Sequence, residues 1–120
     1  PEDYWTAIRR GMAGVVSPED GGTAGDAFSE EFEQLGYLAK ISGKTGSAQV
    51  GNVTIDIQNT SWFVSFAPND NPDIAICVCI PNGLSGSSSA GAIEDIMTYY
   101  FSKLDARSPE TLAKPDDVTP

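Results

Sequence analysis

The tripeptide Lys44-Thr45-Gly46 is the part of this sequence whose residue types are best suited to chemistry. One interpretation is a phosphate-binding loop, because Gly43-Lys44-Thr45 matches the end of that motif. The motif also needs a glycine where Leu38 stands, and a helix afterwards, whereas Gly46 and a strand-like stretch follow. We therefore reject a phosphate loop. Taken alone the tripeptide is a weak signal, and an edge strand carrying a solvated lysine explains it better.

Histidine is absent from the 120 residues, which removes several kinds of site from consideration. A Ser-His-Asp triad, a Cys-His dyad and a His-ligated zinc site all need the imidazole group. The two cysteines, Cys77 and Cys79, lie two apart in an apolar run, so in a strand they point to the same face. That placement is poor for a disulfide, and we interpret them as buried free thiols rather than a metal or redox pair.

The chain has a net charge of −10, from 17 acidic and 7 basic residues. Nucleic acid is excluded as a partner, because phosphate binding needs clustered lysine and arginine. Much of the acid lies in residues 26–33 and 105–117, which we interpret as solvated surface. A hydrophobic content of 40% allows a compact core, in one domain or part of one. No apolar run approaches the ~20 residues that span a bilayer, and no signal peptide is evident.

The elements that must position the tripeptide follow from periodicity. Apolar residues at three- and four-residue steps predict a helix over residues 2–16, which Ser17-Pro18 ends. Residues 18–36 are rich in glycine and predict a loop with weak helical character. Residues 37–49 predict the strand that carries the tripeptide. Its glycines mark a place where another backbone or a ligand comes close.

Further strands are expected downstream. Alternating apolar residues within 50–60 predict either a short strand or an ordered loop. Residues 61–66 and 74–80 predict two strands, which a short turn of proline, asparagine and aspartate joins into an antiparallel hairpin. The strand over 74–80 is apolar on both faces, so we expect it to be central in the sheet.

Residues 90–104 predict the best helix of the chain, with Ser88 or Ser89 as its N-cap. Residues 105–120 predict an acidic, proline-containing tail without a role in the core. We expect four aromatic side chains to pack in the core or on a helix face: Trp5, Trp62, Tyr99 and Tyr100. The order of elements predicts an α+β fold, an antiparallel sheet of about three strands flanked by an N-terminal and a C-terminal helix.

Neighbouring residues give the tripeptide its specificity. Residues 41–49 read I-S-G-K-T-G-S-A-Q, and class B penicillin-binding proteins typically have G-K-T-G-T-A-Q in their active-site strand. Residues 61–68, S-W-F-V-S-F-A-P, resemble the next strand of that family, commonly A-W-F-x-G-F-A-P. Residues 71–75, N-P-D-I-A, resemble its N-P-x-I-A.

Upstream, Arg10-Gly11-Met12 and Gly22-Thr23-Ala24 resemble the G-M helix and the G-T-A loop of the same family. The resemblance covers residues 4–104 in the family's order and spacing. It implies that residues 1–104 are the C-terminal portion of a penicillin-binding transpeptidase domain, with part of the transpeptidase/β-lactamase-like fold.

The resemblance implies a site at which a serine is acylated by the D-Ala-D-Ala end of a peptidoglycan stem peptide, or by a β-lactam. Lys44 would supply positive charge and a proton relay near the nucleophile. Thr45 would offer its hydroxyl to the substrate carboxylate, and Gly46 would let the acyl donor approach the strand. The backbone N–H of Ser47, where threonine is more usual, would be one oxyanion donor. Gln49 would either hydrogen-bond in the cleft or face solvent. No metal and no organic cofactor are implied.

The nucleophile of the family is missing from this sequence. No serine has lysine three residues on or asparagine two residues on, so the S-x-x-K and S-x-N motifs are absent. The cluster from Ser85 to Ser89 is better explained as a helix cap and a flexible loop. We therefore expect this chain alone to be inactive, and the missing N-terminal part of the same domain to supply the serine.

The parent protein would be an enzyme, a serine-type D,D-transpeptidase anchored in the bacterial membrane with this domain on the extracytoplasmic face. The alternatives are a non-catalytic binding or assembly module, and a β-lactam sensor with the same sheet. Apolar strand faces leave association with another copy of the chain open.

Overall fold

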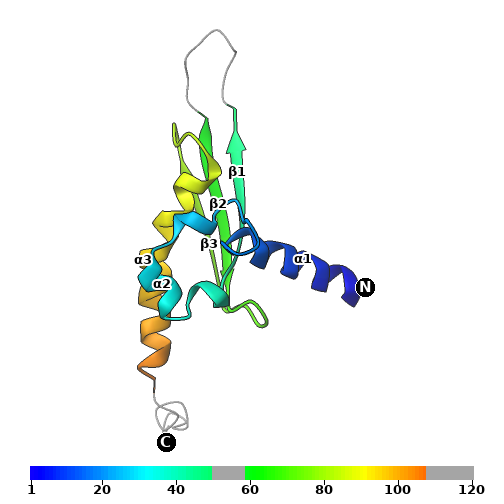
Figure 1. Ribbon diagram of the computed structural model, residues 1–120, viewed down its shortest axis with the longest axis vertical. Coiled ribbons are helices and arrows are strands. Elements are labelled where there is room, and N and C mark those ends of the chain that lie inside the picture. The colour runs from blue at the N-terminus through cyan, green and yellow to red at the C-terminus, as the bar shows by residue number, and fades with distance from the viewer. Residues whose placement is uncertain (50–58, 108–120) are drawn as a thin grey trace, which may run out of the picture.

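A computed structural model describes residues 1–49 and 59–107, which form a small sheet with helices around it (Figure 1). The described sheet contains three antiparallel strands, β1 (Ser42–Ala48), β2 (Thr60–Ala67) and β3 (Ile74–Ile80), in that order. The helices are α1 (Glu2–Val15), α2 (Glu30–Gln34) and α3 (Gly86–Asp105). Two short 3₁₀ turns, Gly25–Ala27 and Leu38–Lys40, lie between α1 and β1. The predicted α+β fold is therefore confirmed.

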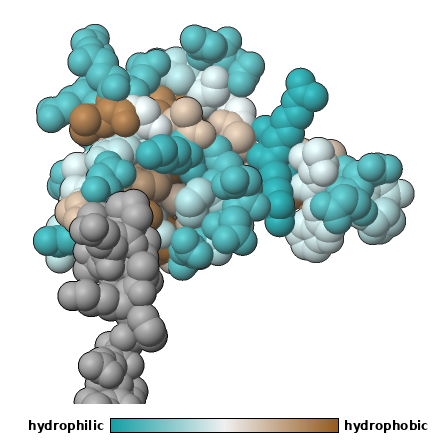
Figure 2. Space-filling view, turned by 90° about the horizontal axis from the view of Figure 1, so that it is seen from below, coloured by the Kyte–Doolittle hydropathy of each residue, from teal (hydrophilic) through white to brown (hydrophobic). Residues whose placement is uncertain are grey.

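The hydrophobic core lies between α3 and one face of the sheet. Phe63 of β2 is fully buried there, and Ile93, Met97 and Phe101 of α3 are buried at four-residue intervals. That interval places the three side chains on one stripe of the helix. Each such side chain contributes roughly 1.5–3 kcal/mol when it leaves water. Seen from below, the surface is mostly hydrophilic, and hydrophobic residues show only in small areas (Figure 2).

Most of the opposite face of the sheet is exposed in the described structure, and we call this exposed part the open face. It consists of the exposed side chains of Lys44, Trp62, Val64, Cys77 and Cys79. The strand register places them together, because Lys44 and Cys77 lie on either side of Val64, and Cys79 lies opposite Trp62. The interpretation of the cysteines as buried thiols was therefore wrong. Their apolar surroundings in the sequence do not tell which face of the sheet another element covers.

The strand over 74–80 has the predicted bounds, but in the described sheet it is not central. Among the described residues β2 lies in the middle and β3 at one edge. Its side chains alternate between a half-buried set that faces α3 and an exposed set on the open face. An apolar run thus predicted the strand correctly but its position in the sheet wrongly.

Helix α1 confirms the predicted helix and extends away from the sheet (Figure 1). None of its residues is buried, and 60% of Trp5 is exposed. Trp62 is 40% exposed, and Tyr99 is exposed on α3, whereas Tyr100 is half-buried. The expected core positions of both tryptophans, and the packed position of Tyr99, were wrong. The periodicity of α1 produces an apolar stripe, but no described element lies against its first half.

The strand predicted from residue 37 begins later, at Ser42, after the 3₁₀ turn. Tyr37 and Leu38 are both buried, at 6% and 7% exposure. Successive residues of a strand point to opposite faces, so a strand could not bury both side chains in one core. The helical turn can, and it stacks the Tyr37 ring on Phe101 with 4.8 Å between centroids.

Helix α3 starts earlier than predicted, at Gly86, with Ser85 as its N-cap in place of Ser88 or Ser89. Its last residue, Asp105, accepts a hydrogen bond from Tyr37 Oη at 2.8 Å. The predictions for residues 50–58 and for 108–120 lie outside the described residues. No helix among the described residues is long and apolar enough to cross a membrane.

Candidate active-site strand

Strand β1 brings together the predicted site residues Lys44, Thr45, Gly46 and Ser47. It pairs with β2 on one side only, and in the described part of the sheet its other edge has no strand partner (Figure 1). An edge strand leaves alternate backbone N–H and C=O groups free to pair with another chain. An extended peptide can therefore be bound along this edge.

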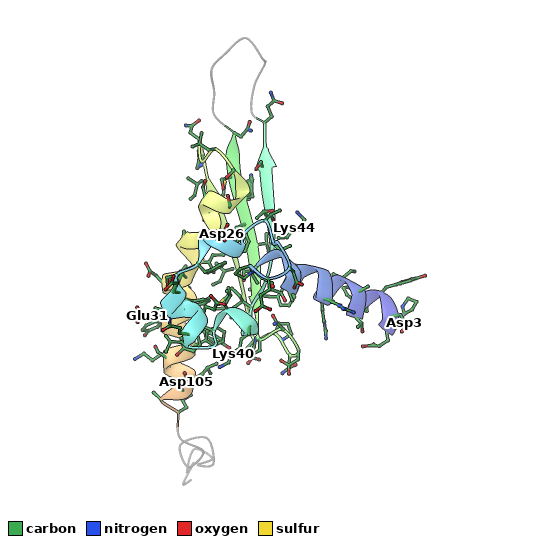
Figure 3. All side chains as sticks on the ribbon, viewed as in Figure 1. Asp3, Asp26, Glu31, Lys40, Lys44 and Asp105 are labelled. Atoms are coloured by element: carbon green, nitrogen blue, oxygen red, sulfur yellow. The ribbon has the colours of Figure 1, made fainter. Side chains whose placement is uncertain are left out.

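Lys44 is exposed on the open face, opposite Val64 of β2. Figure 3 shows it on β1, near the end of α1 that meets the sheet. Its Nζ donates a hydrogen bond to the carbonyl oxygen of Thr45 at 2.6 Å. This bond keeps the ammonium group beside the backbone of β1, and the charge and proton-relay role of Lys44 stays a prediction.

Thr45 points to the side of the sheet that faces α3 and lies opposite Phe63. Its Oγ1 is 2.9 Å from Oγ1 of Thr23, and either hydroxyl can be the donor. Thr23 belongs to the loop after α1, and sequence reasoning gave it no role. The G-T-A resemblance was the only signal that could have indicated it.

Backbone hydrogen bonds fix the loop that carries Thr23 at the residues before and after it. The N–H of Gly22 donates to Ser17 O and the N–H of Ala24 donates to Val15 O, each at 2.9 Å. A Cβ on Gly22 would lie 2.3 Å from the Val15 carbonyl oxygen, so only glycine fits. Ala24 is buried while Thr23 is exposed. The loop thus presents the Thr23 hydroxyl to Thr45 from a fixed backbone.

The two glycines of β1 have different surroundings. A Cβ on Gly43 would lie 2.3 Å from Cζ of Phe63, so the Phe63 ring occupies the space of a side chain. At Gly46 a Cβ would meet Trp62 Cβ at 3.3 Å, a tight but smaller conflict. The predicted close approach at these glycines is thus made in part by the protein's own core.

Ser47 and Gln49 are both exposed at the far end of β1. The Oγ of Ser47 accepts a hydrogen bond from the backbone N–H of Gly86, the first residue of α3, at 2.9 Å. Sequence reasoning considered only the backbone of Ser47 and missed this side-chain contact. Gln49 follows the strand directly and stands next to the undescribed residues 50–58.

The serines from Ser85 to Ser89 do not form a nucleophilic site. Ser89 is fully buried, its Oγ donates to Gly86 O at 3.1 Å, and it lies 2.7 Å from Oγ of Ser61. Ser85 Oγ is 2.8 Å from Ser87 Oγ. The partners of these hydroxyls are other serine hydroxyls and a backbone carbonyl oxygen, whereas activation of a nucleophile needs a base.

Comparison with known protein families gives a match over most of the chain. Residues 1–98 match the penicillin binding protein transpeptidase domain. The chain therefore belongs to this family of transpeptidase domains.

Individual relatives are considerably longer than this chain. The peptidoglycan D,D-transpeptidase MrdA of Haemophilus influenzae is 31% identical over 111 residues, which cover 82% of this chain and 16% of that protein. Penicillin-binding protein 2B of Streptococcus pneumoniae is 33% identical over 95 residues, which cover 78% of this chain and 13% of that protein. The crystal structure of Pseudomonas aeruginosa PBP2 in complex with WCK 5153 has 30% identity and a TM-score of 0.61, over 92% of this chain and 22% of that one. The chain thus spans a small part of the length of each.

Proposed function

We propose that this chain is the C-terminal portion of a D,D-transpeptidase domain, which cross-links peptidoglycan stem peptides by serine acylation and reacts with β-lactams. The observation that carries the proposal is the edge of β1 that has no strand partner among the described residues, on which Lys44, Thr45, Gly46 and Ser47 follow one another. The family match over residues 1–98 supports it.

Each residue of the edge has a part in this proposal. A stem peptide ending in D-Ala-D-Ala lies along β1, and its terminal carboxylate accepts a hydrogen bond from the Thr45 hydroxyl. The N–H of Ser47 donates to the carbonyl oxygen as it becomes an oxyanion, an interaction worth about 3 kcal/mol of barrier in comparable sites. Lys44 provides positive charge and a proton path to the serine, and Gln49 contributes a hydrogen bond at the end of the cleft.

The attacking serine comes from the part of the transpeptidase domain that precedes these residues. The described serines have no lysine in the place that activation requires, which supports an inactive isolated chain. The reaction takes place outside the cytoplasm, on a protein anchored in the membrane. No metal or organic cofactor enters the proposed reaction, because the lysine and the backbone N–H supply the charge stabilisation.

Labelling with a fluorescent penicillin tests the proposal. We expect no covalent label on the isolated chain and a stable label on the longer protein that contains it. In that protein Lys44→Ala abolishes the label, while Lys103→Ala, a change to another lysine on α3 and away from the strand, preserves it. Labelling of the isolated chain would show that the nucleophile was wrongly judged absent. Full labelling of the Lys44→Ala protein would rule out the proposed site.

A further inference from the structure

The first residue of α3 lies directly against the backbone of the Lys44-Thr45-Gly46 tripeptide. A Cβ added to Gly86 would lie 2.7 Å from the nitrogen of Gly46, 2.9 Å from its carbonyl oxygen and 2.8 Å from Cβ of Thr45. Ordinary contacts between such atoms begin at about 3.5 Å, so a side chain here would displace the strand or the helix by about 0.8 Å. The close approach therefore depends on glycine at position 86.

A hydrogen bond joins the same two elements. The N–H of Gly86 belongs to the first turn of α3, whose donors have no partner within the helix. It donates to Oγ of Ser47 at 2.9 Å, and the N-cap residue Ser85 forms no side-chain capping bond. Ser47, which lies on β1 and 39 residues away in the sequence, thus caps the N-terminus of α3.

The start of α3 is also attached to the central strand. Ser61 of β2 donates to the carbonyl oxygen of Ser85, and its Oγ lies 2.7 Å from Oγ of Ser89. The single proton of Ser89 can be donated either to Oγ of Ser61 or to the carbonyl oxygen of Gly86, which is 3.1 Å away. Both hydroxyls are fully buried, and a buried network with its partners in place is rigid. The first turn of α3 is therefore a fixed support against which β1 rests.

We propose that Gly86 and the hydroxyl of Ser47 are positioning residues, which hold the Lys44–Ser47 edge of β1 in the geometry that acylation needs. The inference rests on the proposed function. In residues 1–49 and 59–107, β1 has a strand neighbour on one side only, so α3 determines how far its reactive edge lies from the substrate. An oxyanion donor works at 2.7–3.1 Å, and a misplacement of about 1 Å can cost on the order of 100-fold in rate.

The test measures how fast a fluorescent penicillin acylates the longer protein and its variants, by stopped-flow fluorescence. It separates the acylation rate constant from the dissociation constant of the non-covalent complex. We expect Gly86→Ala to lower the acylation rate constant roughly 10- to 100-fold. Ser47→Ala lowers it by a smaller factor, and Ser47→Thr restores it, because threonine keeps the hydroxyl. The dissociation constant changes less than the rate constant, since the oxyanion contact is made in the transition state.

Two controls separate positioning from a general loss of structure. Gly11→Ala adds a methyl group where no other atom lies within 4 Å, and Ser88→Ala removes an exposed hydroxyl from the same turn of α3. Both should acylate at the unsubstituted rate. The double variant Gly86→Ala/Ser47→Ala should lose less than the product of the single effects, because both changes disturb one contact.

The inference is overturned if Gly86→Ala and Ser47→Ala both acylate within twofold of the unsubstituted protein. It is equally overturned if Ser47→Thr fails to restore the rate, or if the two single effects multiply fully. Should Gly86→Ala fail to fold, the acylation rates of Ser47→Ala and Ser47→Thr decide whether the positioning role stands. An unsubstituted protein that takes no label would overturn the proposed function itself, and this inference with it.

Discussion

The hydroxyl oxygens of Thr23 and Thr45 lie 2.9 Å apart, although 22 residues separate them in the sequence. One belongs to a loop held by backbone hydrogen bonds, and the other to the edge strand β1. If Thr23 donates to Thr45, the proton of Thr45 is free to point towards a substrate carboxylate. The pair therefore couples the loop after α1 to the proposed binding of substrate.

Replacing Thr23 by valine should weaken the reaction with penicillins that carry a free carboxylate by a few-fold, the scale of one hydrogen bond. Thr23→Ser should react normally, because it retains the hydroxyl. Esterified penicillin, which lacks the carboxylate, should not distinguish the two variants. The measurement is the second-order acylation constant of the longer protein with each compound. Equal constants for Thr23→Val and Thr23→Ser with the free acid would contradict the prediction.

The side chain of Asn69 links the turn between β2 and β3 to the start of β1 by hydrogen bonds. Its side chain accepts a hydrogen bond from Ser42 Oγ at 2.7 Å and donates one to Ala39 O at 2.8 Å. Asn69→Ala would leave the fully buried Ser42 hydroxyl without this partner, which costs about 1–3 kcal/mol. Urea unfolding should show a lower midpoint for Asn69→Ala. Asn71→Ala, an exposed position in the same turn, should unfold like the unsubstituted chain. Identical midpoints for the two variants would argue against a stabilising role for the Asn69 hydrogen bonds.

The Tyr37–Asp105 contact should be visible in a pH titration. The hydrogen bond to Asp105, burial and the negative charge of Asp105 each raise the pKa of the Tyr37 phenol above its ordinary value of 10.0. A raised pKa favours the neutral phenol in the folded state. Its contribution to stability is therefore complete below pH 10 and is lost as the pH rises through the raised value.

Burial and Asp73 also raise the pKa of Tyr100, so ultraviolet titration should show late ionisation from both tyrosines, and Tyr37→Phe should remove the Tyr37 share of it. Asp105→Ala lowers the pKa of Tyr37 more than Asp105→Asn does, because asparagine keeps an acceptor oxygen. Asp95→Ala, an exposed position on the same helix, leaves the titration curve unchanged. An unchanged curve for Asp105→Ala would show that the contact does not form in solution.

Cys77 and Cys79 should both react with Ellman's reagent in the folded chain, since both are exposed on the open face. We expect two thiols to react without denaturant, and one in the Cys77→Ser variant. The same chain in guanidinium chloride provides the total thiol count. If reaction required the denaturant, this face would have to be covered in solution.

Periodicity and residue type predicted much of the fold from local information. The strand over 74–80 has the expected bounds, the strand over 61–66 extends by one residue at each end, and the helix from residue 2 is present. These elements follow from side-chain spacing, which the chain itself contains. The burial of individual side chains could not be predicted from that spacing. Trp5 and Trp62 are apolar but exposed, because burial depends on which other element lies above a face.

The K-T-G tripeptide and the motifs on the next two strands could be recognised from the sequence, since the residues of each motif are contiguous in the chain. The sequence by itself therefore predicted which strand carries the proposed reactive edge, and it shows that no serine of this chain has lysine three residues on. Only the tertiary structure decided what holds that edge, through Thr23 against Thr45 and Gly86 against Ser47. A hydrogen bond requires two atoms about 3 Å apart, and no spacing along the chain specifies which distant residues come that close.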